Sequence, residues 1–458
     1  MAGMSVDGLI SGLDTTSLVA QLVQAEGAPK AQLQTRLTTT EAAATAYRQV
    51  NTRFDAVRTA AESLTKPELW STAKATSSSS GVTVTVGTQP QVGSLTFSVT
   101  GIAAAHSLVT TGTPLPNTTD PAGFGSSLQI RNKDGSDRGP AIPIGGNGSL
   151  TEVVKAINAS DKGLTAAAVQ VGPGRFQLQV TAKDSGAANE FSLGGHTLGI
   201  ATQGTDAALK VGTGPGAYTV TSGTNTFADL MPGVTLAVSK LETGVTVGVS
   251  SDPDAVAAKV KSLVDTVNGA LNSIKTYSAA KGGPVAVLKG DSSLMNLSSQ
   301  LLTGMSDAVG ADGSPWTVGL RLEKDGTVLF DQTRFTAALK ADPALAQRMI
   351  AGRAAGVGPD GVSGGTDDVP AVTGVAQRLF DVARSASDAT TGRLTQLAKG
   401  RDDLAKDIQK RIDAWDLRLV HRRETLTRQF TAMETALSSM KNQSNWLAGQ
   451  LASLPSSS

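Results

Sequence analysis

Residues 426–451 read LTRQFTAMETALSSMKNQSNWLAGQL, with apolar side chains at steps of three, four and seven residues. Such spacing places these side chains on one face of an α-helix, as in a coiled coil. No proline interrupts the chain from Val375 to Leu454, and the face continues upstream with a register shift near Ile408. The sequence predicts a long C-terminal helical region. Its apolar seam comprises Leu394, Leu397, Leu404, Ile408, Ile412, Trp415, Leu419, Leu426, Phe430, Met433, Leu437, Met440, Leu447, Leu451 and Leu454.

Polar residues interrupt this C-terminal seam. Arg422, Arg423 and Ser444 fall on or near seam positions, which argues against a uniform, dry zipper. Two interpretations stay open, because spacing alone does not assign a partner helix. The helix packs on its own chain, or it forms a coil that also joins other subunits.

A second helical region occupies the other end of the chain, at residues 14–66. Asp14 or Thr15 is a suitable N-cap, and Gly27 and Pro29 are expected to break the region into two helices. Because both ends of the chain carry apolar stripes, we expect them to pair and to leave the middle as an insertion. The N-terminal stripe comprises Leu33, Leu37, Thr40, Ala44, Tyr47, Asn51, Phe54, Ala61 and Leu64.

The middle of the chain, residues 71–252, is rich in Gly, Thr, Ser and Val and poor in charge. Strict alternation of apolar and polar residues predicts half-buried strands. Ser149 and Glu152 have capping-box spacing and predict one helix at 149–158. The strand candidates are 82–86, 95–99, 164–171, 175–181, 217–221, 234–239 and 245–249, with a turn at residues 172–174 between two of them.

Residues 253–350 return to mixed character. Asp252-Pro253 opens a predicted helix, and Asp325-Gly326 is the turn of a predicted hairpin between residues 320–322 and 327–330. Asp331 is a suitable N-cap for the next helix, and the Gly-rich residues 352–374 predict a loop.

These patterns predict an α+β multidomain fold, in which long terminal helices form a coiled-coil or helical-bundle stalk and mostly β domains are inserted in the middle. The predicted domains are an N-terminal segment at 1–40, a stalk at 41–70 plus 253–429, a first β domain at 71–106 plus 226–252, an inserted second β domain at 107–225 and a C-terminal segment at 430–458.

Composition narrows the function classes. A formal net charge of +1 disfavours nucleic acid as a partner, and the absence of cysteine excludes disulfides and thiolate chemistry. We find no pattern of a cleaved signal peptide and no apolar run of membrane-spanning length, so membrane insertion is not expected.

No residue pattern indicates catalysis. The three histidines, His106, His196 and His421, lie in unlike contexts, and no HExxH, GxSxG or phosphate-loop motif is present. Asp134 and Asp137 lack the further ligands of a calcium loop. We therefore predict a structural protein that is not an enzyme, with no catalytic residues, no metal site and no cofactor.

Three segments resemble the flagellar hook-associated protein 2 family, the cap of the bacterial flagellar filament. The most specific is Val6-Asp7-Gly8-Leu9-Ile10-Ser11-Gly12-Leu13-Asp14-Thr15, followed by residues 18–23 and by Glu26 before Pro29. The second is the hairpin and helix from Leu320 to Leu339, closed by Asp342-Pro343. The third is the tail from Leu394 to Leu451, with Ile412-Asp413-Ala414-Trp415 and Trp446-Leu447. Residues 107–225 carry no motif of this family.

The resemblance implies a specific job in flagellum assembly and motility. Such proteins leave the cell through the flagellar secretion apparatus without a cleaved signal peptide. They form a homo-oligomeric ring, described as a pentamer, at the distal tip of the extracellular filament. There they retain exported flagellin and promote its folding and insertion. The expected partners are flagellin, the neighbouring hook–filament junction protein and an export chaperone.

The resemblance also makes the two terminal legs the candidate filament and subunit interface. Because their apolar stripes are weakened by polar and small residues, we expect residues 1–40 and 430–458 to be mobile alone and to order on docking. For Leu33, Leu37, Phe54 and Leu426, an intramolecular core is the better interpretation. The candidate interface residues are Leu9, Ile10, Leu13, Leu18, Leu22, Phe430, Met433, Leu437, Met440, Trp446, Leu447 and Leu451.

Three alternatives remain at the level of sequence. Another axial flagellar protein, such as flagellin or a junction protein, shares helical ends and a β middle. A surface adhesin shares the Gly, Ser and Thr content, and cell adhesion is also possible as a secondary role of a cap. A carbohydrate-active enzyme needs two converging carboxylates, for which the sequence gives no indication.

Overall fold

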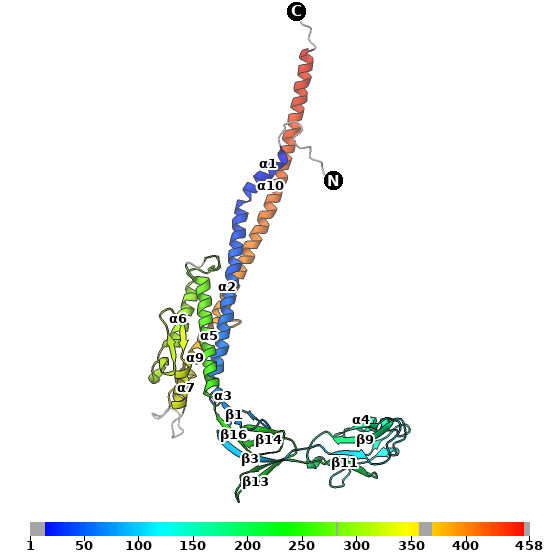
Figure 1. Cartoon of the computed structure of the whole chain (residues 1–458). Helices are drawn as coiled ribbons and strands as arrows, with labels where there is room; N and C mark the ends of the chain where they lie inside the picture. Colours follow the sequence, from blue (N-terminus) through cyan, green and yellow to red (C-terminus); the bar gives the residue numbers. More distant parts are fainter. Residues whose placement is uncertain (1–13, 281–282, 357–368, 453–458) are drawn as a thin grey trace, which may run out of the picture. The chain divides into compact units, whose positions relative to one another are not determined.

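The structure, a computed structural model, describes residues 14–280, 283–356 and 369–452 (Figure 1). The chain divides into two compact units. The helical unit comprises Met1–Lys66 with Ala257–Ser458, and the β unit comprises Pro67–Val256. The division supports the sequence-based expectation that the two chain ends fold together around an inserted middle.

The N-terminal helical region forms two helices, α1 (Thr15–Glu26) and α2 (Ala28–Thr65). The Asp14 carboxylate accepts the Ser17 backbone N–H at 2.8 Å and so caps α1. Gly27 ends α1, and Pro29 lies in the first turn of α2, where its missing N–H is not needed. The predicted cap and break are both confirmed.

The C-terminal region is not one helix but two, α9 (Val375–Ser387) and α10 (Arg393–Ala452). The Asp388 carboxylate accepts the backbone N–H groups of Thr390 and Thr391 at 2.9 and 2.8 Å, which replaces helical hydrogen bonding. At Gly392 a β-carbon would lie 2.4 Å from the Asp388 carbonyl oxygen, so only glycine fits this turn. An Asp-based turn therefore interrupts the proline-free stretch.

The terminal helices α2 and α10 pack together, and α2 also packs on α9. The predicted pairing of the chain ends is thus confirmed. Tyr47 and Phe54 on α2 are fully buried, and the Tyr47 hydroxyl donates to the Asp291 carboxylate. That carboxylate also accepts two backbone N–H groups at the start of α6, so this contact ties α2 to α6. The other α-helices of this unit are α5 (Pro253–Ser278, which begins at the end of the β unit), α6 (Ser292–Ser306), α7 (Gln332–Ala341) and α8 (Pro343–Ile350).

The small hairpin forms as predicted from β17 (Leu320–Leu322) and β18 (Val328–Phe330). Asp331 accepts the Arg334 backbone N–H at 2.9 Å and caps α7. Within the predicted 352–374 loop, bridges join Arg353 to Val372 and Gly356 to Val369, so its described ends are paired. The helical unit also contains the short 3-10 helices η2 (Gly283–Val285), η3 (Gly310–Asp312) and η4 (Pro315–Val318).

The β unit opens with α3 (Pro67–Trp70) and contains two hydrophobic cores. The first β core lies between a five-stranded sheet in the order β1-β16-β3-β12-β13 and a three-stranded sheet in the order β14-β15-β2. All pairs in both sheets are antiparallel. These strands are β1 (Ala73–Ser77), β2 (Val82–Val86), β3 (Gly93–Gly101), β12 (Ala207–Val211), β13 (Tyr218–Ser222), β14 (Thr226–Met231), β15 (Val234–Val238) and β16 (Glu242–Ser251).

The second β core packs α4 (Leu150–Ala159) against a four-stranded antiparallel sheet in the order β11-β4-β9-β8. Ser149 caps α4, as predicted, but its own N–H donates to Asn147 rather than to Glu152, so only half of the capping box forms. The strands and the 3-10 helix around the second β core are β4 (Ser107–Thr110), β5 (Ser127–Leu128), β6 (Ile130–Asn132), β7 (Ile142–Pro143), β8 (Leu164–Gly172), β9 (Arg175–Ala182), η1 (Ala187–Asn189), β10 (Phe191–Leu193) and β11 (Leu198–Thr202).

The predicted end of the inserted domain at residue 225 needs correction. Strands β12 and β13 belong to the sheet of the first β core, and Ala207, Leu209 and Val211 are buried there. The second β core therefore ends near residue 203. Only the strand corresponding to β13 was expected in this region, because the short stretch Ala207–Val211 between glycines has too weak an alternation to place.

Candidate interaction surface

Ion pairs between the terminal helices account for one polar position of the seam, Arg422. Arg422 of α10 donates to the Glu26 carboxylate of α1 at 2.8 Å. Two further pairs join α2 to α10, Lys30 with Asp416 and Arg48 with Asp402. Because these pairs are partly exposed, they align the helices more than they stabilise them.

The seam of α10 changes character along the helix. In its first part Ile408, Ile412 and Leu426 are buried, and Phe430 is half-buried. Beyond Phe430, no residue of α10 whose side chain the structure describes is buried. The change of environment occurs while the spacing of apolar residues stays helical.

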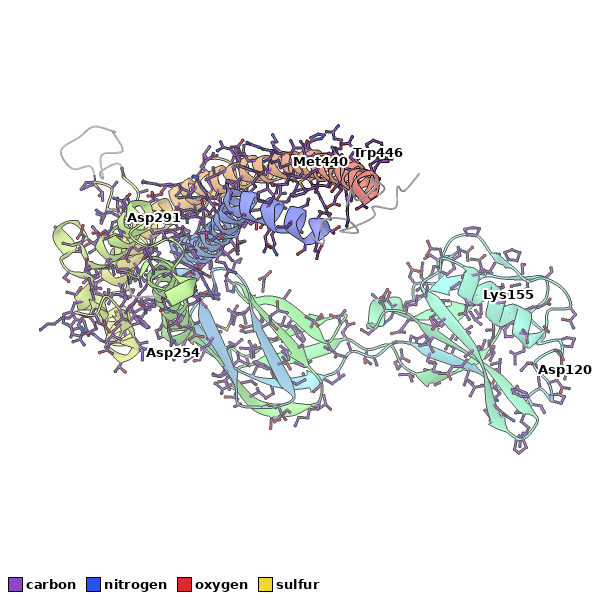
Figure 2. The ribbon with its side chains drawn as sticks, turned by 90° about the horizontal axis from the view of Figure 1, so that it is seen from above. Asp120, Lys155, Asp254, Asp291, Met440 and Trp446 are labelled. Atoms are coloured by element: carbon purple, nitrogen blue, oxygen red, sulfur yellow. The ribbon has the colours of Figure 1, made fainter. Side chains whose placement is uncertain are left out.

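The far part of α10 presents an apolar row, which we call the α10 end row: Met433, Leu437, Met440 and Leu447. Met440 is 65% exposed and Leu447 is 54% exposed, and Trp446 beside the row is also exposed. Figure 2 shows Met440 and Trp446 on the terminal part of this helix. An exposed apolar row on a helix is typical of a surface that another protein covers. The side chain of Leu451 lies outside the described residues.

Of the five N-terminal candidate interface residues, the structure describes two. On α1, Leu18 and Leu22 are exposed while Val19 is buried, and α1 packs along α10. The remaining candidates, Leu9, Ile10 and Leu13, lie outside the described residues. The structure therefore brings Leu18 and Leu22 to the helix pair that carries the α10 end row.

The four residues expected to be core divide evenly. Phe54 and Leu426 are buried as predicted, whereas Leu33 and Leu37 are only half-buried. Sequence reasoning also missed Leu417 and Val420, which are 65% and 54% exposed on α10. Their spacing of three residues, off the main seam, was the available signal for a second apolar face.

The histidines and the two aspartates considered as possible ligands make contacts with neighbouring residues of the fold. The buried His106 accepts the Gly204 backbone N–H on Nδ1 at 3.3 Å, and the His196 ring packs against Phe124. His421 lies beside Glu424 on the exposed face of α10. Asp134 accepts from Ser136, which lowers the pKa of this carboxyl, and Asp137 pairs with Arg131. Among the described residues, no cluster of His, Cys, Asp and Glu is arranged to hold a metal ion.

Terminal helices that pack together, with β folds inserted between them and an exposed apolar row at one end, define an α+β assembly protein. Comparison with protein families gives two matches: the flagellar hook-associated protein 2 N-terminus over residues 11–106 and the flagellar hook-associated protein 2 C-terminus over residues 204–442. The chain belongs to the flagellar hook-associated protein 2 family. It is a structural flagellar cap protein and not an enzyme.

Full-length relatives support this assignment. The chain is 27% identical over 495 residues to the A-type flagellar hook-associated protein 2 of Pseudomonas aeruginosa, with 98% of each chain covered. It is 26% identical over 479 residues to the flagellar hook-associated protein 2 of Escherichia coli K12, again with 98% of each covered. The two family matches leave residues 107–203 unassigned, and this gap coincides with the second β core.

A solved structure has the same fold. The D1-D2-D3 domains of the flagellar cap protein FliD from Escherichia coli align with a TM-score of 0.60 at 23% identity, covering 78% of this chain and 99% of that one. None of the described helices combines the length and the apolar character that crossing a membrane requires.

Proposed function

We propose that this chain acts at the distal tip of the flagellar filament, where several copies form a ring that retains exported flagellin and promotes its folding and insertion. The α10 end row is the observation that carries this proposal, because it is an apolar helix face that the described part of the chain leaves uncovered. None of the four side chains is buried against the described part of the chain, and we therefore assign their contribution to assembly.

We infer that the two ends of the chain are the legs of the cap. Helix α1 with the start of α2, and α10 beyond Phe430, dock into the open end of the filament and order there. Partly polar contacts suit this task, because a cap must release and remake them as each subunit inserts. A pentameric ring, flagellin, the junction protein and an export chaperone are the partners in this proposal. The chain reaches the extracellular tip through the flagellar export apparatus.

The decisive experiment compares two double variants of the full chain in a bacterium that lacks its own copy of this protein. Met440→Ser with Leu447→Ser removes two members of the α10 end row, and Asn442→Ser with Asn445→Ser changes two exposed neighbours on the same helix. We expect the first variant to leave flagellin as free subunits in the medium and to abolish swimming. The second should restore both filaments and swimming.

Two measurements on purified protein accompany this test. Far-UV circular dichroism should give the same unfolding curve for both variants, because exposed substitutions change stability by only about 0.5 kcal/mol. Light scattering should give a discrete oligomer for the wild type and a smaller species for the Met440→Ser, Leu447→Ser variant. Full-length filaments made by that variant would contradict the proposed role of the α10 end row.

A further inference from the structure

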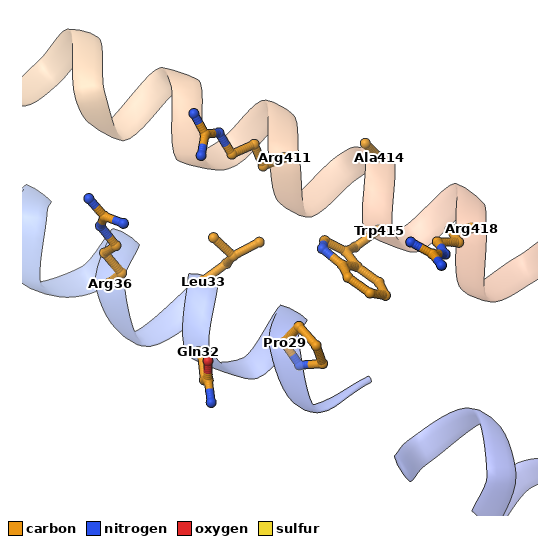
Figure 3. Close-up of a pocket in the computed structure, with 8 residues that line it drawn as sticks. All are labelled: Pro29, Gln32, Leu33, Arg36, Arg411, Ala414, Trp415 and Arg418. Carbon is orange, nitrogen blue, oxygen red and sulfur yellow. The ribbon is translucent and has the colours of Figure 1, made fainter. Parts of the chain in front are cut away.

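A cleft of about 540 Å³ lies between α2 and α10, away from the α10 end row. Its lining residues are Pro29, Gln32, Leu33 and Arg36 of α2 and Arg411, Ala414, Trp415 and Arg418 of α10 (Figure 3). The cleft is open to solvent and large enough to receive side chains from a second molecule.

The interior of the cleft is apolar. In Figure 3 the Leu33 side chain and the Trp415 indole lie between the two helices, and Pro29 faces Trp415. Leu33 and Trp415 are both half-buried, although each occupies a seam position where full burial was possible. The helix pair therefore leaves an apolar floor that its own side chains do not fill.

Every charged residue that lines the cleft is an arginine. Arg411 is bound to Asp407 at 3.0 Å, and the Arg418 guanidinium lies 4.9 Å from the centre of the Trp415 ring. For Arg36, the described residues provide no carboxylate within salt-bridge distance. The nearby Asp416 is occupied by Lys30. The rim consequently carries positive charge that is only partly compensated.

A second cleft with the same kind of lining lies further along the helix pair. It also measures about 540 Å³ and is formed at the α1–α2 break by Ala20, Val23, Gln24, Gly27, Ala28, Ala31, Leu419 and Arg423. Small side chains leave its floor open, and its one charged residue is again an arginine. Two successive clefts suit a helical segment better than a small molecule, because a helix presents anchors at intervals of one or two turns.

From this charge and shape we propose that the α2–α10 cleft docks an acidic amphipathic helix of another protein. Carboxylates of that helix would pair with Arg36 and Arg418, for which guanidinium–carboxylate geometry is well suited. An apolar side chain beside them would enter between Leu33 and Trp415. Arginine and tryptophan are the residue types that most often dominate binding energy in such interfaces.

The test uses the full-length protein and a fluorescently labelled peptide of about 15 residues with Glu and Leu along one face. Binding is followed by anisotropy, with the same peptide carrying Lys in place of Glu as the control ligand. The protein variants are Arg36→Glu with Arg418→Glu, Trp415→Ala, and the matched control Arg53→Glu, an exposed arginine of α2 outside the cleft.

We expect the acidic peptide to bind the wild type and the Arg53→Glu variant equally, and the Lys peptide to bind neither. The double Arg variant should bind at least roughly tenfold more weakly, and added salt should weaken wild-type binding. Trp415→Ala should also weaken peptide binding, but its binding should depend on salt as that of the wild type does. This difference distinguishes the contribution of the apolar floor from that of the arginines.

Three results would overturn the proposal: no binding of the acidic peptide at low salt, equal loss in the Arg53→Glu variant, or an oligomer that dissociates only when Arg36 and Arg418 are reversed. The last result would assign the cleft to a second copy of this chain. Swimming of the double Arg variant is a separate readout, so loss of peptide binding and loss of cap function are distinguishable.

Discussion

The two parts of α10 carry the same spacing of apolar residues in opposite surroundings. Up to Leu426, seam residues such as Ile408 and Ile412 are buried against the rest of the helical unit. Beyond Phe430, Met440 and Leu447 continue the same face and are more than half exposed. Helical spacing therefore specifies which side chains share a face, whereas burial depends on whether the chain supplies a partner for that face.

The largest difference in stability should appear between a residue of the packed core beside α10 and a residue of the exposed end of α10. Phe54→Ala on α2 removes a fully buried ring from the packed side, and we expect a loss of about 3–5 kcal/mol in the free energy of unfolding. Leu447→Ala on the exposed side should change it by no more than about 0.5 kcal/mol. Urea unfolding followed by circular dichroism measures both. Similar losses for the two variants would mean that the end of α10 is packed in the isolated chain.

The contact between Tyr47 and Asp291 should have an intermediate effect on the packed side. Tyr47→Phe removes a buried hydroxyl that donates to the carboxylate at the start of α6. We expect a loss of about 1–2 kcal/mol in the free energy of unfolding. The exposed Tyr218→Phe in the β unit is the matched control and should leave stability unchanged.

The same tyrosine predicts a dependence on alkaline pH. Burial, with the Asp291 hydrogen bond and charge, raises the pKa of Tyr47 to about 12, compared with about 10 in an unfolded chain. Because the folded state holds this proton more tightly, the stabilisation is fully present below about pH 10 and is lost as the pH rises through about 12. In the wild type the free energy of unfolding should fall as the pH rises across that range, and in Tyr47→Phe this part of the fall should be absent. A slope identical to that of the wild type would contradict the assignment.

Sequence reasoning was most successful where a local rule fixes the structure. The Asp14 cap, the Asp325-Gly326 hairpin and the strand pair around residues 172–174 depend on neighbouring residues, and each forms as expected. The turn at Asp388 was missed although its signal, the run Asp388-Ala389-Thr390-Thr391-Gly392, was present. Strand β12 was missed because Ala207–Val211 alternates too weakly to be placed locally, and its pairing with β3 joins residues more than 100 positions apart.

For the candidate interface, too, the sequence predicted only what depends on local spacing. Spacing identified the α10 end row, but the exposure of Leu417 and the arginine-lined cleft depend on how α2 packs against α10. Pairs such as Arg422 with Glu26 join residues 396 positions apart, and no local pattern specifies which charge meets which. Tertiary packing decides these contacts after the helices have formed.

That Glu26–Arg422 pair gives the smallest predicted effect, and it lies where the packed part of α10 gives way to the exposed part. Both side chains are more than 40% exposed, so a double-mutant cycle with Glu26→Gln and Arg422→Gln should yield a coupling of only about 0.2–1 kcal/mol. The coupling should shrink in high salt, because exposed charges are screened. Such a weak link would let α1 detach from α10 while the rest of the helical unit stays folded. A salt-independent coupling above about 2 kcal/mol would instead make α1 a fixed part of the packed helical unit, and the boundary between the two regions would then lie beyond α1.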